Sequence, residues 1–122
     1  MSANAYKLSW DAAKTVLRVL REVCAVRDWQ LIAAHVRSTH VHCIVGGVAQ
    51  PNRAVGDFKA YASRALNQSE GHQKRWAREG STRGLPTSAA IRAAVRYVAE
   101  GQGEPMAVYV SHRTADDAAS PP

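Results

Sequence analysis

The feature that most constrains the fold is a pair of apolar segments separated by a very short break. WQLIAAHVR (residues 29–37) is one extended segment, and HVHCIV (residues 40–45) alternates strictly between two faces. Ser38 and Thr39 leave room only for a tight turn, and a Gly-Gly pair ends the second segment. Two strands this close in sequence predict an antiparallel β-hairpin.

Amphipathic helical patterns flank this hairpin. Apolar positions over residues 10–27 recur at helical spacing, and Ser9 is placed to cap that helix. Pro51 opens a second helical pattern. A third begins at Thr87 or Ser88 and runs to about Glu100, and residues 106–110 form a last strand. Strands interleaved with amphipathic helices predict an α+β sandwich.

One domain accounts for the length of 122 residues. We assign it to residues 1–113 and expect residues 114–122, which are small, polar and Pro-ended, to be a disordered tail. No run of 18 apolar residues is present, and the first residues lack the apolar centre of a signal peptide, so we expect a cytoplasmic location and no membrane partner. Cys24 and Cys43 each lie in an apolar run and are expected to be reduced core residues.

The net charge of +6 and the pI of about 9.8 indicate a polyanionic partner, with nucleic acid first and a membrane surface second. Cations and aromatic residues gather in the middle of the chain, where cations can follow phosphates and aromatic rings can stack on unpaired bases. The candidates for DNA contact are Lys59, Tyr61, Arg64, Arg75, Trp76 and Arg83. The alternative is a solvated loop held by Trp76.

His40 and His42 are two residues apart on the second strand, so their side chains point the same way. Their Cα atoms lie roughly 6.6 Å apart at ~3.3 Å per residue, which lets both imidazoles converge on one divalent ion. A histidine pair of this kind is common and often binds nothing. Its place in the middle of an apolar strand favours a metal, because two buried imidazoles without a partner are costly.

Four segments of the chain resemble segments of a known family and occur in the same order as in that family. His40-Val41-His42 is a histidine–hydrophobe–histidine motif, and HVRSTHVHCIV resembles the strand pair of the small single-tyrosine HUH transposases of bacterial insertion sequences, including the relatives associated with repetitive extragenic palindromes. FKAYASRALN, RWAREGSTRGL and AVRYVAEGQGEPM resemble the three segments that follow in that family. Together these segments span most of residues 10–110.

This resemblance implies a ferredoxin-like sandwich, with an antiparallel sheet and helices packed on one face, usually as a homodimer. It also implies metal-dependent cleavage and transfer of single-stranded or hairpin DNA through a 5′-phosphotyrosine. His40 and His42 would be ligands of Mg²⁺ or Mn²⁺, and Tyr97 would be the nucleophile. In such proteins the tyrosine helix of one subunit can complete the site of the other. The same resemblance places the protein at the bacterial nucleoid.

Two positions depart from the family pattern. The third ligand, often Gln or Asn, commonly lies one helical turn after the tyrosine, but position 101 is Gly; we therefore assign Gln102, with Glu100 as the alternative. Family members also carry a strand before the first helix, whereas nine residues precede Trp10. The alternatives are a shortened or degenerate chain whose sandwich lacks the first strand, and a chain that borrows this strand from a partner. The competing hypotheses are an inactive DNA-binding remnant or regulator, and a metal protein unrelated to DNA.

Overall fold

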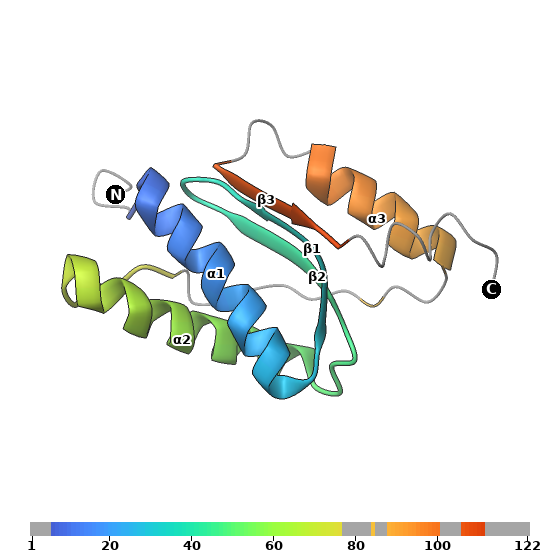
Figure 1. Cartoon of the computed structure of the whole chain (residues 1–122), viewed down its shortest axis with the longest axis horizontal. Helices are drawn as coiled ribbons and strands as arrows, with labels where there is room; N and C mark the ends of the chain where they lie inside the picture. The colour runs from blue at the N-terminus through green and yellow to red at the C-terminus, as the bar shows by residue number, and fades with distance from the viewer. Residues whose placement is uncertain (1–5, 77–83, 85–87, 101–105, 112–122) are drawn as a thin grey trace.

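The computed structural model describes residues 6–76, 84, 88–100 and 106–111 (Figure 1). These residues form helices and strands in an order that confirms the α+β class: α1 (Trp10–Arg27), β1 (Gln30–Val36), β2 (Val41–Gly46), α2 (Pro51–Glu70), α3 (Ser88–Glu100) and β3 (Ala107–Val110). The tail at residues 114–122 and the residues around Thr87 lie outside the described part.

Helix α1 begins and ends where local chemistry favours it. The Ser9 hydroxyl accepts a hydrogen bond from the backbone N–H of Ala12 at 3.1 Å, which satisfies one of the free donors of the first turn. At the other end Asp28 takes a left-handed conformation, with φ of 60°. The chain then turns directly toward β1, and Trp29, just before that strand, packs edge-on against Phe58 of α2, with ring centroids 5.8 Å apart.

The sheet has three antiparallel strands in the order β2-β1-β3. The backbone N–H of Arg37 donates to the carbonyl of His40 at 2.8 Å, which closes the expected hairpin. A register shift between Leu31 and Ala33 marks a bulge in β1. β1 is thus the central strand and β2 lies at one edge of the sheet.

The helices divide between the two faces of the sheet (Figure 1). The larger core lies on the face covered by α1, with α2 packed alongside α1. Helix α3 lies on the opposite face, where Val98 packs on Ile32, Ala33 and Ile44. The expectation of helices on one face therefore describes α1 and α2 but not α3. The physical reason is that α3 carries its own apolar stripe, and the sheet still has an uncovered apolar face to receive it.

Both cysteines are free thiols, as expected, with Cys24 buried and Cys43 half-buried. Across the described ranges, no helix is both long enough and apolar enough to span a bilayer.

Candidate active site

His40 and His42 present their rings to the same side of the hairpin. The two ring centroids are 6.1 Å apart and the ring planes differ by only 10°. His42 lies in β2, whereas His40 comes just before the first residue of the strand. In the sheet register His42 lies opposite His35, two positions from the pair formed by Ala33 and Ile44, so these histidines face α3.

The environment of His42 favours its neutral imidazole, the form that binds a metal. Burial lowers the pKa of His42, and the nearby His40, Arg37 and His35 lower it further. The Nδ1 atom of His40 lies 2.8 Å from the Thr39 hydroxyl, in hydrogen-bond contact. That contact occupies Nδ1 and leaves Nε2 as the nitrogen of His40 that can reach a metal.

These two residues fit a metal as part of its ligand set. Their rings lie near one another on one face with nearly parallel planes, so they would have to turn toward one another for both to bind one ion. Within the part of the chain that the structure describes, no three histidine, cysteine or acidic side chains are grouped to hold an ion. Glu100 is an exposed residue at the end of α3, and Gln102 lies outside the described residues. The third donor is thus not assembled beside the histidines in this part of the chain.

Tyr97 is 62% exposed on α3. It borders a shallow hollow of about 580 Å³ that is lined by the outward side of the helix, by Arg92, Ala93, Arg96, Tyr97 and Glu100. Helix α3 packs on the histidine-bearing face of the sheet through Val98, one residue further on. The tyrosine hydroxyl is consequently available to a molecule that approaches α3 from outside.

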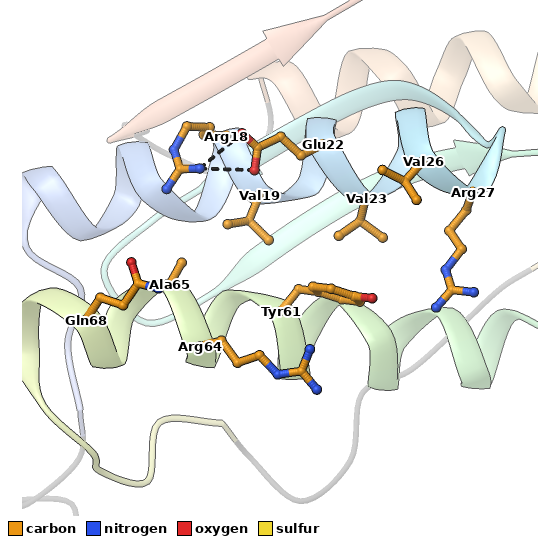
Figure 2. Close-up of a pocket in the computed structure, with 10 residues that line it drawn as sticks. All are labelled: Arg18, Val19, Glu22, Val23, Val26, Arg27, Tyr61, Arg64, Ala65 and Gln68. Atoms are coloured by element: carbon orange, nitrogen blue, oxygen red, sulfur yellow. Dashed lines mark hydrogen bonds and ion pairs between the residues drawn. The ribbon is translucent and has the colours of Figure 1, made fainter.

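A second feature is a groove between α1 and α2 (Figure 2). These helices lie on the other side of the sheet from the histidines. The volume of this groove is about 340 Å³. Tyr61 projects into it from α2, and the guanidinium of Arg64 lies over the Tyr61 ring, 5.1 Å from its centroid. The α1 side supplies the exposed Val26 and the cation of Arg27, which is 3.5 Å from the Asp57 carboxylate. An aromatic ring, an apolar wall and cations are thus combined in one groove.

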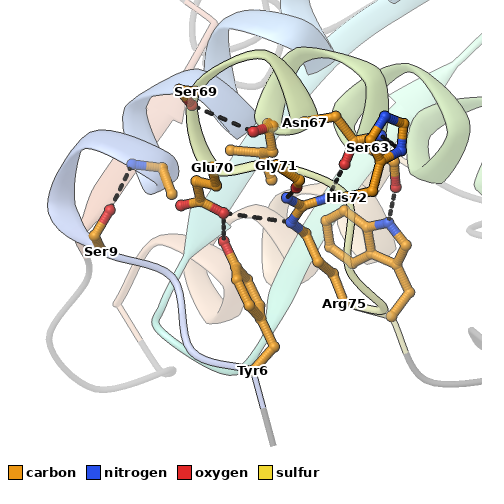
Figure 3. A network of polar contacts seen from close by, with 12 residues as sticks. Tyr6, Ser9, Ser63, Asn67, Ser69, Glu70, Gly71, His72 and Arg75 are labelled. Atoms are coloured by element: carbon orange, nitrogen blue, oxygen red, sulfur yellow. Dashed lines mark hydrogen bonds and ion pairs between the residues drawn. The ribbon is translucent and has the colours of Figure 1, made fainter.

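Arg75 is held inside the chain (Figure 3). Its side chain is fully buried, and its guanidinium donates to Asn67 Oδ1 at 2.7 Å, to the carbonyl of Gly71 at 2.8 Å and to Glu70 at 3.4 Å. The Tyr6 hydroxyl donates to the same Glu70 carboxylate at 2.8 Å. Burial and this hydrogen bond raise the pKa of Tyr6. The network therefore fastens the segment before α1 to the end of α2.

Trp76 has a comparable position. Its Nε1–H donates to the Ser63 hydroxyl at 2.6 Å, and its ring packs against the larger core, which agrees with its expected role as an anchor. The prediction that Arg75 and Trp76 contact DNA stays a prediction, since the structure gives each of them an internal role. Lys59 is half-buried on α2, and Arg83 lies outside the described residues.

The family model described as "Transposase IS200 like" matches residues 5–83, which is well over half of the chain. The chain belongs to the IS200-like transposase family. No curated protein and no solved structure matches it.

The matched region places the histidine pair and α2 within the IS200-like part of the chain. Helix α3, with Tyr97, follows after the matched residues end. The assignment to the IS200-like transposases therefore rests on the hairpin and the first two helices, and the role of Tyr97 depends on its own geometry and on the resemblance described above.

One residue of the site escaped the sequence analysis. His35 is completely buried in β1, directly opposite His42. The available signal was a single histidine within the apolar run LIAAHV, where valine or leucine would be ordinary. In an IS200-like transposase this places a third histidine on the same face of the sheet as the other two.

Proposed function

We propose that this chain is an active transposase that cuts single-stranded DNA and joins it again through Tyr97. The observation that carries the proposal is the parallel pair of His40 and His42 on the sheet face that α3 covers, with Tyr97 exposed on that same helix. A metal-binding side chain pair and a hydroxyl nucleophile are two components that metal-assisted phosphodiester transfer uses.

The chemistry follows from the nucleophile. The Tyr97 oxygen attacks phosphorus in line with the scissile bond, so that the Oη–P bond forms as the P–O3′ bond breaks. The phenol loses its proton and the departing 3′ oxygen gains one. The products are a 5′-phosphotyrosine and a free 3′-OH. Because the phosphodiester energy is kept in the covalent bond, a second 3′-OH can displace Tyr97 without any other source of energy.

His40 and His42 would hold Mg²⁺ or Mn²⁺, together with Gln102 or with Glu100 as the alternative. When bound, the ion supplies positive charge that neutralises the scissile phosphate. The residues of the chain do the rest: His40 presents Nε2 because Thr39 occupies its Nδ1, and the lowered pKa of His42 favours its neutral imidazole.

In a homodimer, the exposed Tyr97 of one subunit would lie at the site of the other. Tyr97 borders a hollow on the outward side of α3, beside Arg92 and Arg96. In the proposed dimer α3 of one subunit faces the histidine pair of its partner, so that each site combines residues from two copies. The two arginines then lie where the DNA phosphates must pass.

The DNA would be single-stranded or a hairpin, encountered at the bacterial nucleoid. Tyr61 and Arg64 offer a ring for an unpaired base and a cation for a phosphate, and Lys59 lies on the same helix. Arg83 is proposed as a further phosphate contact. Arg75 and Trp76 would contribute by shaping the segment after α2, with any direct DNA contact secondary to that.

The test is formation of a covalent adduct. Protein, Mn²⁺ and a pool of hairpins with randomised single-stranded flanks are mixed, with the label on the 3′ end because that fragment stays on the tyrosine. The wild type should give a labelled band that survives denaturation, and Tyr97→Phe should give none while binding DNA equally well. Tyr61→Phe is the matched control and should still form the adduct.

The second candidate is a DNA-binding protein without cleavage, such as a regulator or a remnant. One observation favours it: the described residues do not assemble a third metal ligand beside the histidine pair. A wild-type protein that shifts hairpin DNA in a gel but forms no adduct with Mn²⁺ or Mg²⁺ would support this candidate over the enzyme.

A further inference from the structure

His35 has an unusual position for a histidine. It lies in β1, the central strand, and its side chain is 0% exposed. In the register of the sheet it is opposite His42 of β2 on one side and Val108 of β3 on the other. Its neighbours in the strand, Ala34 and Val36, are also fully buried. The imidazole therefore sits in the middle of the sheet.

Such a position is costly for a polar ring. An imidazole loses its hydration when it is buried, and an apolar side chain of similar size would fill the same space without that loss. Leu31 and Ile32 show that this strand otherwise buries aliphatic residues. A buried histidine at this position therefore indicates a role other than filling the core.

The register indicates what that role is. Side chains directly opposite one another in antiparallel strands point to the same face, with Cβ atoms ~4.5–5.5 Å apart. His35 thus borders His42 from the buried side of the sheet, while the His40 ring lies 6.1 Å from His42 on the side of the hairpin turn. His42 is accordingly placed between two other imidazoles on one face of the hairpin.

Metal-binding histidines are usually held by a second group that fixes the tautomer and the ring orientation. We propose that His35 is a positioning residue, which sets the orientation and tautomer of the His42 ring from the buried side. It acts through His42 and is not itself a ligand, because it is completely buried and the described residues form no three-membered ligand group. The proposal rests on the proposed function, in which His42 binds the metal.

The experiment compares His35→Leu, which fills the space, with His35→Gln, which keeps polar atoms there. Binding of Mn²⁺ is measured by calorimetry and by electron paramagnetic resonance. His35→Leu should weaken Mn²⁺ binding by roughly 10- to 100-fold, the usual effect of removing a supporting partner of a ligand. His35→Gln should recover most of the affinity. His72→Gln, a change at an exposed histidine beyond α2, is the control and should bind as the wild type does.

A second readout needs no metal. Nitrogen-15 chemical shifts of the His42 ring report its tautomer, and the wild type and His35→Gln should each show one dominant form, whereas His35→Leu should show a mixture. Unchanged Mn²⁺ affinity and an unchanged His42 tautomer in His35→Leu would overturn the inference.

If the wild type binds no Mn²⁺, the proposed function fails, but the tautomer comparison still decides the role of His35. If His35→Leu does not fold, a wild-type tautomer in His35→Gln supports the inference and a mixture opposes it.

Discussion

The buried side chain of Arg75 lies with its Nε 3.4 Å from the carboxylate of Glu70, which is itself only 24% exposed. Removal of the carboxylate leaves a guanidinium without its counter-charge, away from water. Glu70→Ala should lower the free energy of unfolding by roughly 2–4 kcal/mol, measured by urea denaturation. Glu22→Ala is the matched control, because its ion pair with Arg18 is exposed on both sides, and it should cost less than about 1 kcal/mol. Equal losses in the two variants would contradict this difference.

The groove between α1 and α2 leads to a prediction about DNA affinity. Tyr61→Ala should weaken binding of single-stranded DNA by about 1–3 kcal/mol, the usual value of one stacked base, whereas Tyr61→Phe should bind normally. Fluorescence anisotropy with a labelled oligonucleotide measures both. Tyr109→Phe is a suitable comparison, since that tyrosine packs against the core on the sheet. Full affinity in Tyr61→Ala would show that the groove does not hold a base.

Arg64 should behave differently from Tyr61, because the contribution of a phosphate contact to DNA affinity depends strongly on the salt concentration. Arg64→Ala should weaken binding to all sequences about equally and reduce the slope of log affinity against log salt by roughly one phosphate contact. The measurement is a series of binding curves from low to moderate salt. A changed sequence preference with an unchanged slope would assign Arg64 to base recognition instead.

The proposed exchange of α3 between subunits can be tested by mixing inactive variants. In the proposed mechanism His40→Ala lacks a metal ligand and Tyr97→Phe lacks the nucleophile, so neither should form an adduct alone. If one subunit supplies Tyr97 to the other, a mixture should regain up to about a quarter of wild-type adduct, because roughly half of the dimers are mixed and each of these has one complete site. A mixture that stays inactive, while a wild-type dimer is active, would mean that each chain uses its own tyrosine.

The two thiols predict how stability changes at high pH. Burial raises the pKa of Cys24 from 9.0 to about 11 and, with the influence of Cys24, that of Cys43 to about 12. The native protein therefore retains thiol protons that the unfolded chain releases. Their stabilising contribution is complete below pH 9.0 and is lost as the pH rises through 11 and 12. Thermal melts between pH 8 and pH 11 should show falling stability, and a Cys24→Ala, Cys43→Ala double variant should show a smaller fall.

Much of the fold could be predicted because the signals are local. The bounds of α1 agree with its apolar repeat and its Ser9 cap, and the hairpin follows from alternation around a short break. The face that α3 covers could not be predicted, because an apolar stripe shows that a helix is buried without indicating which side of a sheet receives it. His35 was missed for a similar reason: only the pairing of β1 with β2 places it opposite His42.

The apolar cluster beneath α3 has only four buried members among the described residues, Ile32, Ala33, Ile44 and Val98, whereas α1 alone contributes seven buried residues to the larger core. Less apolar surface holds α3 to the sheet, so its local opening requires less free energy than opening of α1. Backbone amides of α3 should then exchange with deuterium well before those of α1. If α3 carries the nucleophile, as proposed, weak attachment has a use: it would let α3 leave one surface and settle on another while the rest of the chain stays folded.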